Sequence, residues 1–220
     1  MFNWFNKKHE NHPDFWKAYE EQFQEKPPAK VSDIRFIVFD TETTGFDYKK
    51  DRMLCIGAVT VKQNQIDVSE TFEYYLKQEK FNPETVKIHG ILQNERIEQI
   101  SEEEAIRNFL KFIGNSVLVA HHANFDVTMF NAALRRMNLP KLQNRVLDTG
   151  TLYRKTRLTS NLIDQNKNYS LDEIAEAYNI DVKDRHTAAG DAFITALAFL
   201  KILGRLDKNG NLLFKELTEA

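Results

Sequence analysis

The sequence predicts an α/β fold in which a mixed central β-sheet is flanked by helices on both faces. Two observations lead to this prediction. Strand-forming runs at residues 34–40, 53–61 and 65–76 follow one another with no helical pattern between them, which favours antiparallel neighbours. From about residue 101 onward, helical patterns alternate with short apolar runs, as is typical of strands connected by helices.

The first predicted strand, at residues 34–40, is an apolar run interrupted only by Arg35. Such a nearly continuous run is typical of a strand that is buried on both faces. The second and third strands are joined near residues 62–64, and this short connection predicts that they pair directly. A short helix over residues 82–90 follows, and Gly90 is expected to end it.

The second half of the sequence carries clear helix signals. Ser101 with Glu104, and Ser170 with Glu173, form capping-box patterns that open helices. The last long helix is expected to end at Gly204, because glycine is common just after a helix. The helices are predicted at residues 101–113, 125–137, 170–178 and 187–203, with short strands at 116–120 and 145–147.

Composition limits the class of protein. The 220 residues are 42% hydrophobic, which supports a packed core, and the mean hydropathy of -0.51 argues against a membrane protein. The net charge is -2 and the isoelectric point is near 6.3, so contacts with nucleic acid are expected to be local. The single cysteine, Cys55, excludes an internal disulfide. Because the N-terminus also lacks the apolar core of a signal peptide, the cytoplasm is the expected compartment.

Three segments are predicted along the chain: an N-terminal helical extension over residues 1–32, a main domain over residues 33–206 and a C-terminal tail over residues 207–220. The helix of the extension is expected either to dock onto the domain or to contact a partner. Its aromatic residues are spaced for one helical face: Phe15, Trp16, Tyr19 and Phe23.

A pair of acidic residues follows the first apolar run. Asp40 and Glu42 lie two residues apart, and because side chains alternate along a strand, both should point to the same side. Two carboxylates at a buried strand end repel each other and lose hydration, unless a hard divalent cation compensates them. The alternative is an ordinary strand end whose acids face solvent. The apolar strand before the pair and the Thr43-Thr44-Gly45 turn after it favour the cation site.

Two more acids stand in informative contexts. Asp126 follows a short apolar strand and a polar turn, and its simplest role is to stabilise the dipole of the helix that begins there. Asp191 lies inside an otherwise apolar helix, where its neighbours offer little compensating charge. His186 precedes it at about the start of that helix. The simplest alternatives are that Asp191 lies on a polar face and that His186 is a loop residue with no role.

The order and spacing of these residues resemble three motifs of the DnaQ-like 3′–5′ exonucleases of the DEDDh type, a family with a ribonuclease H-like fold. Asp40-x-Glu42-Thr-Thr-Gly45 resembles the first motif, and Asn124-Phe-Asp126 resembles the second. His186, with Asp191 five residues later, resembles the third. Each motif alone is weakly specific, but the three in order are strongly specific.

The resemblance implies a metal-dependent phosphodiester hydrolase. Hydrolysis needs an activated water and stabilisation of charge on the phosphate and the leaving oxygen, which two divalent ions, Mg²⁺ or Mn²⁺, can supply. By resemblance, Asp40 would bridge the two ions. Glu42 and Asp191 would complete one metal site, and Asp126 would support the other. His186 would be the general base, because a neutral imidazole can accept a proton from the attacking water.

The same resemblance suggests contacts to the terminal nucleotide. Stacking on Phe125 would tolerate any base, as an exonuclease requires, whereas a core position is the competing interpretation. His89 lies in the segment Ile88-His-Gly-Ile91, which resembles one found between the first two motifs; its alternative is a helix-end residue that faces solvent. The suggested substrate-binding residues are Thr43, Thr44, Gly45, His89 and Phe125.

Three other polar residues receive structural interpretations. Asp148 resembles an acid that recurs in the family, and we interpret it as a helix cap or as a residue that supports the site from behind. His121 and His122 follow a predicted strand, and they are expected to finish that strand rather than to act in catalysis.

These inferences predict an enzyme that releases nucleoside 5′-monophosphates from the 3′ ends of nucleic acid, with single-stranded DNA favoured over RNA. The alternatives are a proofreading subunit that works within a DNA polymerase complex in DNA replication or repair, an exoribonuclease, and an inactive binding module. The presence of all four acids and the histidine argues against the last. Residues 212–214, Leu-Leu-Phe, faintly resemble a sliding-clamp peptide, so a polymerase or a clamp is a candidate partner, and a membrane is not.

Overall fold

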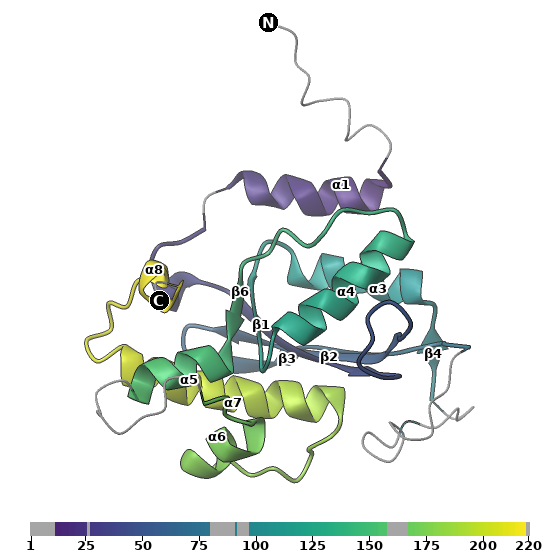
Figure 1. The fold of residues 1–220 in the computed structure, drawn as a ribbon. Helices are drawn as coiled ribbons and strands as arrows, with labels where there is room; N and C mark the ends of the chain where they lie inside the picture. The colour runs from purple at the N-terminus through teal and green to yellow at the C-terminus, as the bar shows by residue number, and fades with distance from the viewer. Residues whose placement is uncertain (1–11, 26, 80–90, 92–96, 158–166, 219–220) are drawn as a thin grey trace, which may run out of the picture.

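The computed structural model describes residues 12–25, 27–79, 91, 97–157 and 167–218. Within these residues, six strands form one mixed sheet with the order β4-β3-β2-β1-β5-β6. The predicted mixed sheet with helices on both faces is confirmed (Figure 1). The strands are β1 (Phe36–Thr43), β2 (Met53–Lys62), β3 (Gln65–Leu76), β4 (Gln99–Ile100), β5 (Val117–Ala120) and β6 (Val146–Asp148).

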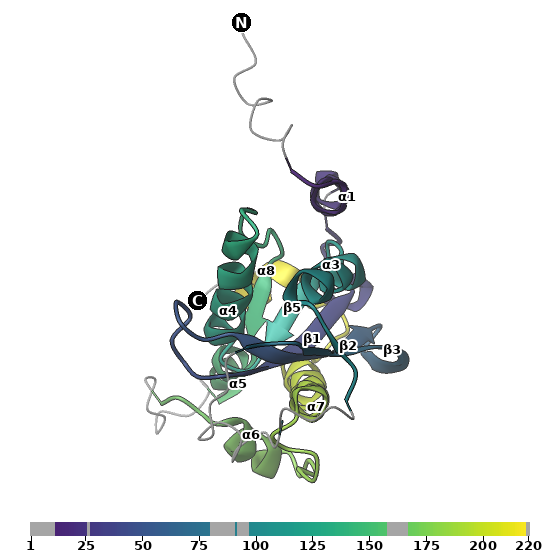
Figure 2. The ribbon, with the colours of Figure 1, turned by 90° about the vertical axis from the view of Figure 1, so that its right-hand side faces the viewer.

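Helices α3 and α4 cover one face of the sheet, with α1 packed beside α3, and helices α5, α6 and α7 cover the other face (Figures 1 and 2). The helix predicted over residues 82–90 lies outside the described residues. Among the helices that the structure describes, none has the length and apolar character needed to cross a membrane. The helices are α1 (Asp14–Glu21), α3 (Glu102–Ile113), α4 (Asn124–Arg136), α5 (Thr149–Arg157), α6 (Leu171–Ala177), α7 (Ala188–Leu206) and α8 (Phe214–Thr218).

The pairing of the strands follows the length of the connections between them. Strand β1 pairs antiparallel with β2, and β2 pairs antiparallel with β3, as the short connection at residues 62–64 predicts. Strand β5 follows α3, and it pairs parallel with β1; β6 follows α4 and pairs parallel with β5. The short strand β4 pairs parallel with β3, so the sheet is antiparallel only among β3, β2 and β1 and is parallel towards both edges.

Alternation along β1 builds a hydrophobic core on each side of the sheet. Ile37 and Phe39 are fully buried in the core beneath α3 and α4. Phe36 and Val38 are buried in the opposite core, where the ring of Phe36 lies 5.0 Å from that of Phe199 in α7. Because both faces of this part of β1 are buried, residues 36–39 are all apolar rather than alternating with polar residues.

Arg35 interrupts the apolar run without leaving a charge uncompensated. Its Nη1 donates to the carbonyl oxygen of Phe112 at 3.1 Å and to the hydroxyl of Ser116 at 2.8 Å. Its Nη2 donates to the hydroxyl of Thr60 at 3.2 Å and pairs with Glu70 at 3.0 Å. A half-buried guanidinium with this many partners ties the start of β1 to β2, β3 and the end of α3.

Helix α1 docks onto the domain through one aromatic face. Trp16 and Tyr19 are fully buried in the core beneath α3 and α4. The hydroxyl of Tyr19 donates to Oδ1 of Asn144 at 2.6 Å and accepts from the backbone N–H of Gln143 at 2.9 Å. Because buried polar groups are costly when unpaired, these bonds fix α1 to the loop before β6.

The C-terminal part differs from the prediction. Gly204 does not end the last long helix, which continues to Leu206, because a helical glycine costs only about 1 kcal/mol and Leu206 gains packing against the core. The tail forms α8, whose Phe214 and Leu217 are buried. The backbone N–H of Phe214 also donates to the carbonyl oxygen of Ala29. The segment that resembles a clamp peptide is thus packed against the domain.

Strand β1 extends beyond the strand beside it. Its pairing with β5 covers only Phe36 to Val38, so residues 39–43 have no strand on that side. Helix α4 begins shortly after β5 ends, and α7 lies against β1 and β2. Ligands of α/β proteins bind beyond the carboxyl ends of parallel strands, so this open end of β1 is where a site is expected.

Gly57 allows α7 to approach the sheet. It lies opposite Asp40 in the β1–β2 ladder. A Cβ atom at this position would overlap with backbone atoms of Ala188 and Ala189 in the first turn of α7. Backbone atoms cannot rotate away as a side chain can, so this residue must be glycine for the helix to start where it does.

Gly57→Ala is expected to lower the free energy of unfolding by about 1–3 kcal/mol, because the added methyl group pushes α7 away from β2. Gly204→Ala is the matched control, since no atom lies within 4 Å of a Cβ there; it should raise stability by up to about 1 kcal/mol. Urea unfolding of both variants measures the difference. Similar effects of the two substitutions would show that the α7–β2 contact is not a constraint.

Candidate active site

Three carboxylates meet at the open end of β1. Asp40 and Glu42 continue the alternation that places Phe36 and Val38 on the α7 side of the sheet, and Asp191 comes from the first turn of α7. One oxygen from each of the three carboxylates lies within 4.8 Å of the other two. A set of oxygen donors at this spacing suits a hard divalent cation.

Asp126 reaches the same place from α4. It is almost fully buried, and its Oδ1 accepts from the backbone N–H of Thr41 at 3.0 Å and from the Thr41 hydroxyl at 2.7 Å. Thr41 points away from Asp40 and Glu42, to the α4 side of the strand. One β-strand therefore supplies two of the acids directly and holds a third through the threonine between them.

The loop before α7 carries His186, an exposed residue in the left-handed region with a φ of +67°. Its backbone N–H donates to Oδ1 of Asp191 at 3.3 Å. The loop packs tightly on the helix, because a Cβ atom at Gly190 would overlap with the carbonyl oxygen of Asp184. Glycine at 190 therefore allows His186 to lie beside Asp191.

These residues line one cleft of about 440 Å³. A larger hollow of about 830 Å³ lies between Pro27, Pro28 and α8, but it contains none of the predicted site residues. The smaller cleft is therefore the candidate active site. Its lining consists of Asp40, Thr41, Glu42, Thr43, Phe46, His121, His122, Phe125, Asp126, Arg185, His186 and Asp191.

Among the described residues that line the cleft, four carboxylates face a single Lys or Arg side chain, Arg185. Burial, and then the charges of Asp126, Asp191 and Glu42, raise the pKa of Asp40 well above its usual range. Burial and the same neighbouring carboxylates raise the pKa of Glu42 to about 7. Burial also raises the pKa of Asp126 to about 7, although its bonds from Thr41 oppose the shift. Such a cluster gains most from divalent cations, which restore the charged form of each acid.

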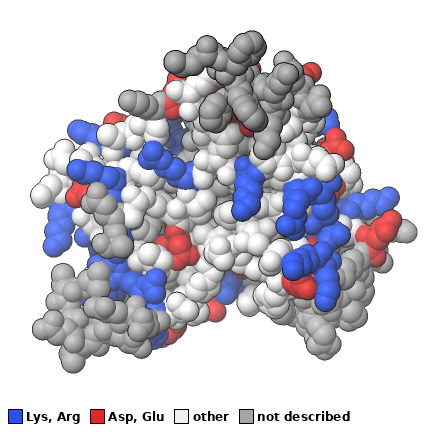
Figure 3. Space-filling view, turned by 45° about the horizontal axis from the view of Figure 1, so that its top comes forward, with Lys and Arg blue, Asp and Glu red and all other residues white. Residues whose placement is uncertain are grey.

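Basic side chains are dispersed on the face of the molecule that Figure 3 shows. On the face seen from the side of α1, Lys and Arg side chains gather in separate groups with uncharged surface between them (Figure 3). Contacts with a polyanion on this face would therefore be local, as the composition predicts.

The predicted substrate-binding residues take different positions. Thr43 and Phe125 line the cleft. Thr44 is fully buried, and its hydroxyl donates to Oδ1 of Asp51 at 3.0 Å, which shapes the loop after β1. The carbonyl oxygen of Gly45 accepts from the Thr43 hydroxyl at 2.9 Å within the same loop. His89 lies outside the described residues.

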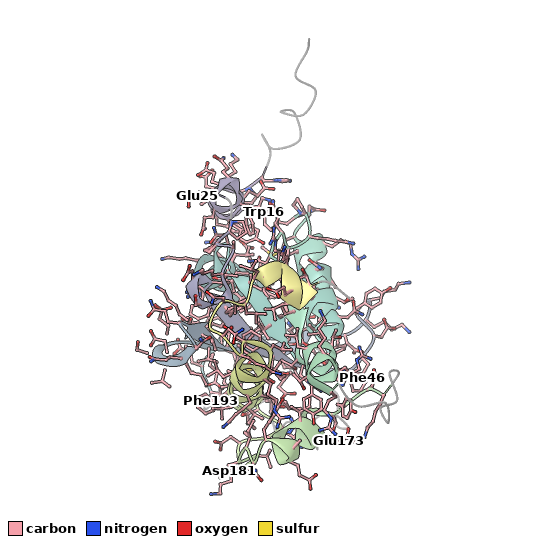
Figure 4. All side chains as sticks on the ribbon, turned by 90° about the vertical axis from the view of Figure 1, so that its left-hand side faces the viewer. Trp16, Glu25, Phe46, Glu173, Asp181 and Phe193 are labelled. Carbon is pink, nitrogen blue, oxygen red and sulfur yellow. The ribbon has the colours of Figure 1, made fainter. Side chains whose placement is uncertain are left out.

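Five residues that line the cleft were not among the predicted site residues: Thr41, Phe46, Arg185, and the two histidines interpreted as strand-end residues, His121 and His122. Phe46 is 79% exposed and projects from the body of the protein, with its ring centroid 5.7 Å from that of Phe125 (Figure 4). An exposed aromatic residue directly after the Thr-Thr-Gly turn was the available signal. Burial and the neighbouring His122 lower the pKa of His121 to about 4, so its imidazole is neutral.

Asp148 has the geometry of a helix cap. Its Oδ1 accepts from the backbone N–H of Thr151 at 2.8 Å in the first turn of α5, and its Oδ2 accepts from the backbone N–H of Ala123 at 2.9 Å. Asp148 therefore joins the start of α5 to the turn that carries His121 and His122, directly behind the cleft.

Comparisons with known proteins agree with this arrangement. A family model for exonucleases, RNase_T, matches residues 37–199. The PolC-type DNA polymerase III of Caldanaerobacter subterraneus is 36% identical over 176 residues, which cover 80% of this chain but only 12% of that protein. The DNA polymerase III subunit epsilon of Aquifex aeolicus is 34% identical over 175 residues, which cover 79% of this chain and 83% of the relative.

Solved structures of low sequence identity share the fold. Escherichia coli exonuclease I in complex with a dT13 oligonucleotide superposes with a TM-score of 0.67 at 18% identity, covering 80% of this chain and 42% of that one. Exonuclease X in complex with 5′ overhanging duplex DNA superposes with a TM-score of 0.60 at 22% identity, covering 84% of this chain and 98% of that one. The predicted ribonuclease H-like fold is confirmed, and the family match extends from β1 into α7. The chain therefore belongs to the DnaQ-like exonuclease family.

Proposed function

We propose that this chain removes nucleotides from the 3′ end of single-stranded DNA, releases nucleoside 5′-monophosphates and requires two divalent metal ions. The convergence of Asp40, Glu42, Asp126 and Asp191 with His186 in one cleft is the observation that supports the proposal most. The family is generally dependent on divalent metals, and the oxygen donors here suit Mg²⁺ or Mn²⁺. The proposal places the protein in the cytoplasm.

Each acid would have a distinct part in holding the ions. Asp40, at the centre of the cluster, would bridge both. Glu42 and Asp191 would complete one site, and Asp126, held by Thr41, would support the other. When bound, the ions supply an activated water and stabilise charge on the phosphate and the leaving oxygen.

His186 would act as the general base. It lies on the rim of the cleft, its backbone N–H is bonded to Asp191, and its ring is exposed, so water can reach the imidazole. The imidazole accepts a proton from the water whose oxygen attacks the terminal phosphorus. The bond from phosphorus to the preceding O3′ breaks and this oxygen takes a proton from solvent, so the terminal nucleotide leaves as a 5′-monophosphate and the shortened strand ends in a 3′-hydroxyl.

The cleft also suits an unpaired terminal base. Phe46 and Phe125 present two aromatic rings at its edge, and base–aromatic stacking contributes about 1–3 kcal/mol per base with little sequence preference. Thr43 would face the sugar and phosphate of the same nucleotide. The oligonucleotide bound to the structurally similar exonuclease I is consistent with a single-stranded substrate. In this proposal, residues 33–206 are the catalytic domain, and residues 1–32 and 207–220 are its appendages.

Asp40→Asn is expected to reduce turnover by on the order of 10³-fold, because the variant loses the ligand that both ions share. In EDTA the same variant should be at least as stable as the wild type, since one of the mutually repelling charges is removed. The measurements are cleavage of 5′-labelled single-stranded DNA, with RNA and duplex DNA compared in Mg²⁺, Mn²⁺ and EDTA, and thermal denaturation.

Glu103→Gln on the exposed face of α3 is the matched control for that experiment, because it also removes one carboxylate but lies away from the cleft. Its turnover should equal that of the wild type. Undiminished turnover by Asp40→Asn would remove this site from consideration, and faster cleavage of RNA than of DNA would identify the protein as an exoribonuclease.

Metal-free stability is expected to fall as pH rises from about 5 to 8. The pKa of Glu42 is 4.5 in an ordinary environment and about 7 in the folded chain, so the folded state binds more protons between these values. The stability that protonation provides is complete below pH 4.5 and is lost as pH passes through 7.

Thermal denaturation at pH 5.5 and pH 8, in EDTA and in Mn²⁺, checks this expectation. Mn²⁺ should raise the melting temperature more at pH 8, because it binds the ionised acids. Glu42→Gln is the control variant, and it should flatten the dependence in EDTA. A metal-free melting temperature that rises across this window would contradict the proposed origin of the pKa shifts.

A proofreading role within a DNA polymerase complex is the second candidate function. The 34% identity to an epsilon subunit of DNA polymerase III, over 83% of that subunit, favours it. A proofreading subunit should degrade mismatched primer ends much faster when its polymerase is added. An independent nuclease should cleave single strands at the same rate with and without the polymerase. Assays of the purified chain, with and without a bacterial replicative polymerase, distinguish the two.

A further inference from the structure

We propose that Arg185 is the counter-cation of the metal-free site, and that it leaves Asp191 for Asp172 when a divalent ion binds. The affinity for metal is then set by competition between the ion and this arginine. The inference rests on the proposed function, because it concerns how the same acids acquire their metal.

The guanidinium of Arg185 contacts two carboxylates at once. Its Nη1 pairs with Oδ2 of Asp191 at 2.5 Å. Its Nε donates to Oδ1 of Asp172, in the first turn of α6, at 2.7 Å, and its Nη2 donates to Oδ2 of Asp172 at 3.3 Å. The arginine and Asp191 are largely buried, whereas the side chain of Asp172 is 61% exposed.

Arg185 is paired with Asp191, one of the carboxylates that would bind the metal. Asp191 belongs to the group whose oxygens lie within 4.8 Å of those of Asp40 and Glu42. Its Oδ2 is paired with Arg185, and its Oδ1 accepts from the N–H of His186. A guanidinium and a divalent cation repel each other, so both cannot contact one small carboxylate without a loss of free energy.

Asp172 provides a place for the displaced arginine. The Nε and Nη2 atoms already form a two-point contact with both oxygens of Asp172, which is the strong geometry for an arginine–carboxylate pair. Loss of the Asp191 contact would leave this pair intact. A small rotation of the guanidinium could therefore free Asp191 without moving the backbone of the loop.

The competition should be measurable because positive charge is scarce in the described part of the cleft. Arg185 is the sole Arg or Lys among the described residues that line the cleft, whereas four carboxylates line it. Its charge also opposes the rise in pKa of Asp40 and Glu42. In the absence of metal, Arg185 is therefore the main compensation for the cluster.

A purely structural role for Arg185 predicts the opposite result. If the arginine served only to orient Asp191, its removal would disorder a metal ligand and weaken metal binding. Competition predicts instead that its removal strengthens binding. The sign of the change in metal affinity thus separates the two roles.

Isothermal titration of the full chain with Mn²⁺, without substrate, tests the proposal. Arg185→Gln should bind Mn²⁺ roughly ten-fold more tightly than the wild type. Asp172→Asn should bind more weakly, because the arginine then has only Asp191 as a partner. The double variant should match Arg185→Gln, since Asp172 acts through the arginine.

Lys183→Gln is the matched control, because it removes one positive charge from the same loop while its partner, Asp181, is exposed. Its Mn²⁺ affinity should equal that of the wild type. Thermal denaturation gives a second readout: in EDTA, Arg185→Gln should melt below the wild type, and saturating Mn²⁺ should close that gap.

If the wild type binds Mn²⁺ and cleaves DNA but Arg185→Gln binds Mn²⁺ no more tightly than the wild type, the proposed competition is wrong and the proposed function stands. If the wild type neither binds Mn²⁺ nor cleaves DNA, the proposed function fails as well. If Asp172→Asn weakens binding equally with and without Arg185, Asp172 acts by its charge and not as the alternative partner, and the release step is wrong.

Discussion

Mutual repulsion among carboxylates at the open end of β1 is the constraint on which the rest of the site depends. Three of them lie within 4.8 Å of one another, and burial raises the pKa of Asp40 and Glu42 further. Such a cluster lowers the stability of the folded chain by itself. The surrounding fold must supply the compensating free energy until cations arrive. A site that is unfavourable when empty binds cations strongly, because binding relieves the repulsion.

The fold holds the cluster together with two features of β1. Alternation sends Asp40 and Glu42 towards α7, while Thr41 turns towards α4 and bonds to Asp126. The missing side chain at Gly57 lets the first turn of α7 lie against the sheet, so that Asp191 can join the pair on β1. The two core clusters on either side of the sheet then keep α4 and α7 from moving apart under repulsion.

Much of this could be predicted from sequence because the signals are local. The apolar run with Asp40 and Glu42 at its end predicted β1, and the two capping-box patterns predicted the starts of α3 and α6. The box is complete at Ser170, whereas at Ser101 only the serine side chain forms its bond. A close contact between segments that are far apart in the chain has no local sequence pattern that would predict it. Gly57 resembles any glycine in a strand, and Gly204 has the pattern of a helix end although packing of Leu206 carries the helix past it. Strand β4 has only two residues and depends on its pairing with β3, so the sequence alone did not predict it. Helix α5 was anticipated only through the interpretation of Asp148 as a helix cap.

The packed core of the protein extends beyond the residues that match the family. The match begins at residue 37, yet Trp16 and Tyr19 of α1, which lies on the outer side of α3 (Figure 2), belong to the same buried cluster as Ile37 and Phe39 of β1. Tyr19 also bonds to Asn144, whose Nδ2 donates to the carbonyl oxygens of Gly114 and Ser116 at each side of the turn before β5. That strand ends at the turn leading into α4 and Asp126. Helix α1, which lies outside the family match, thus stabilises the start of β5, and β5 leads into the helix that carries Asp126.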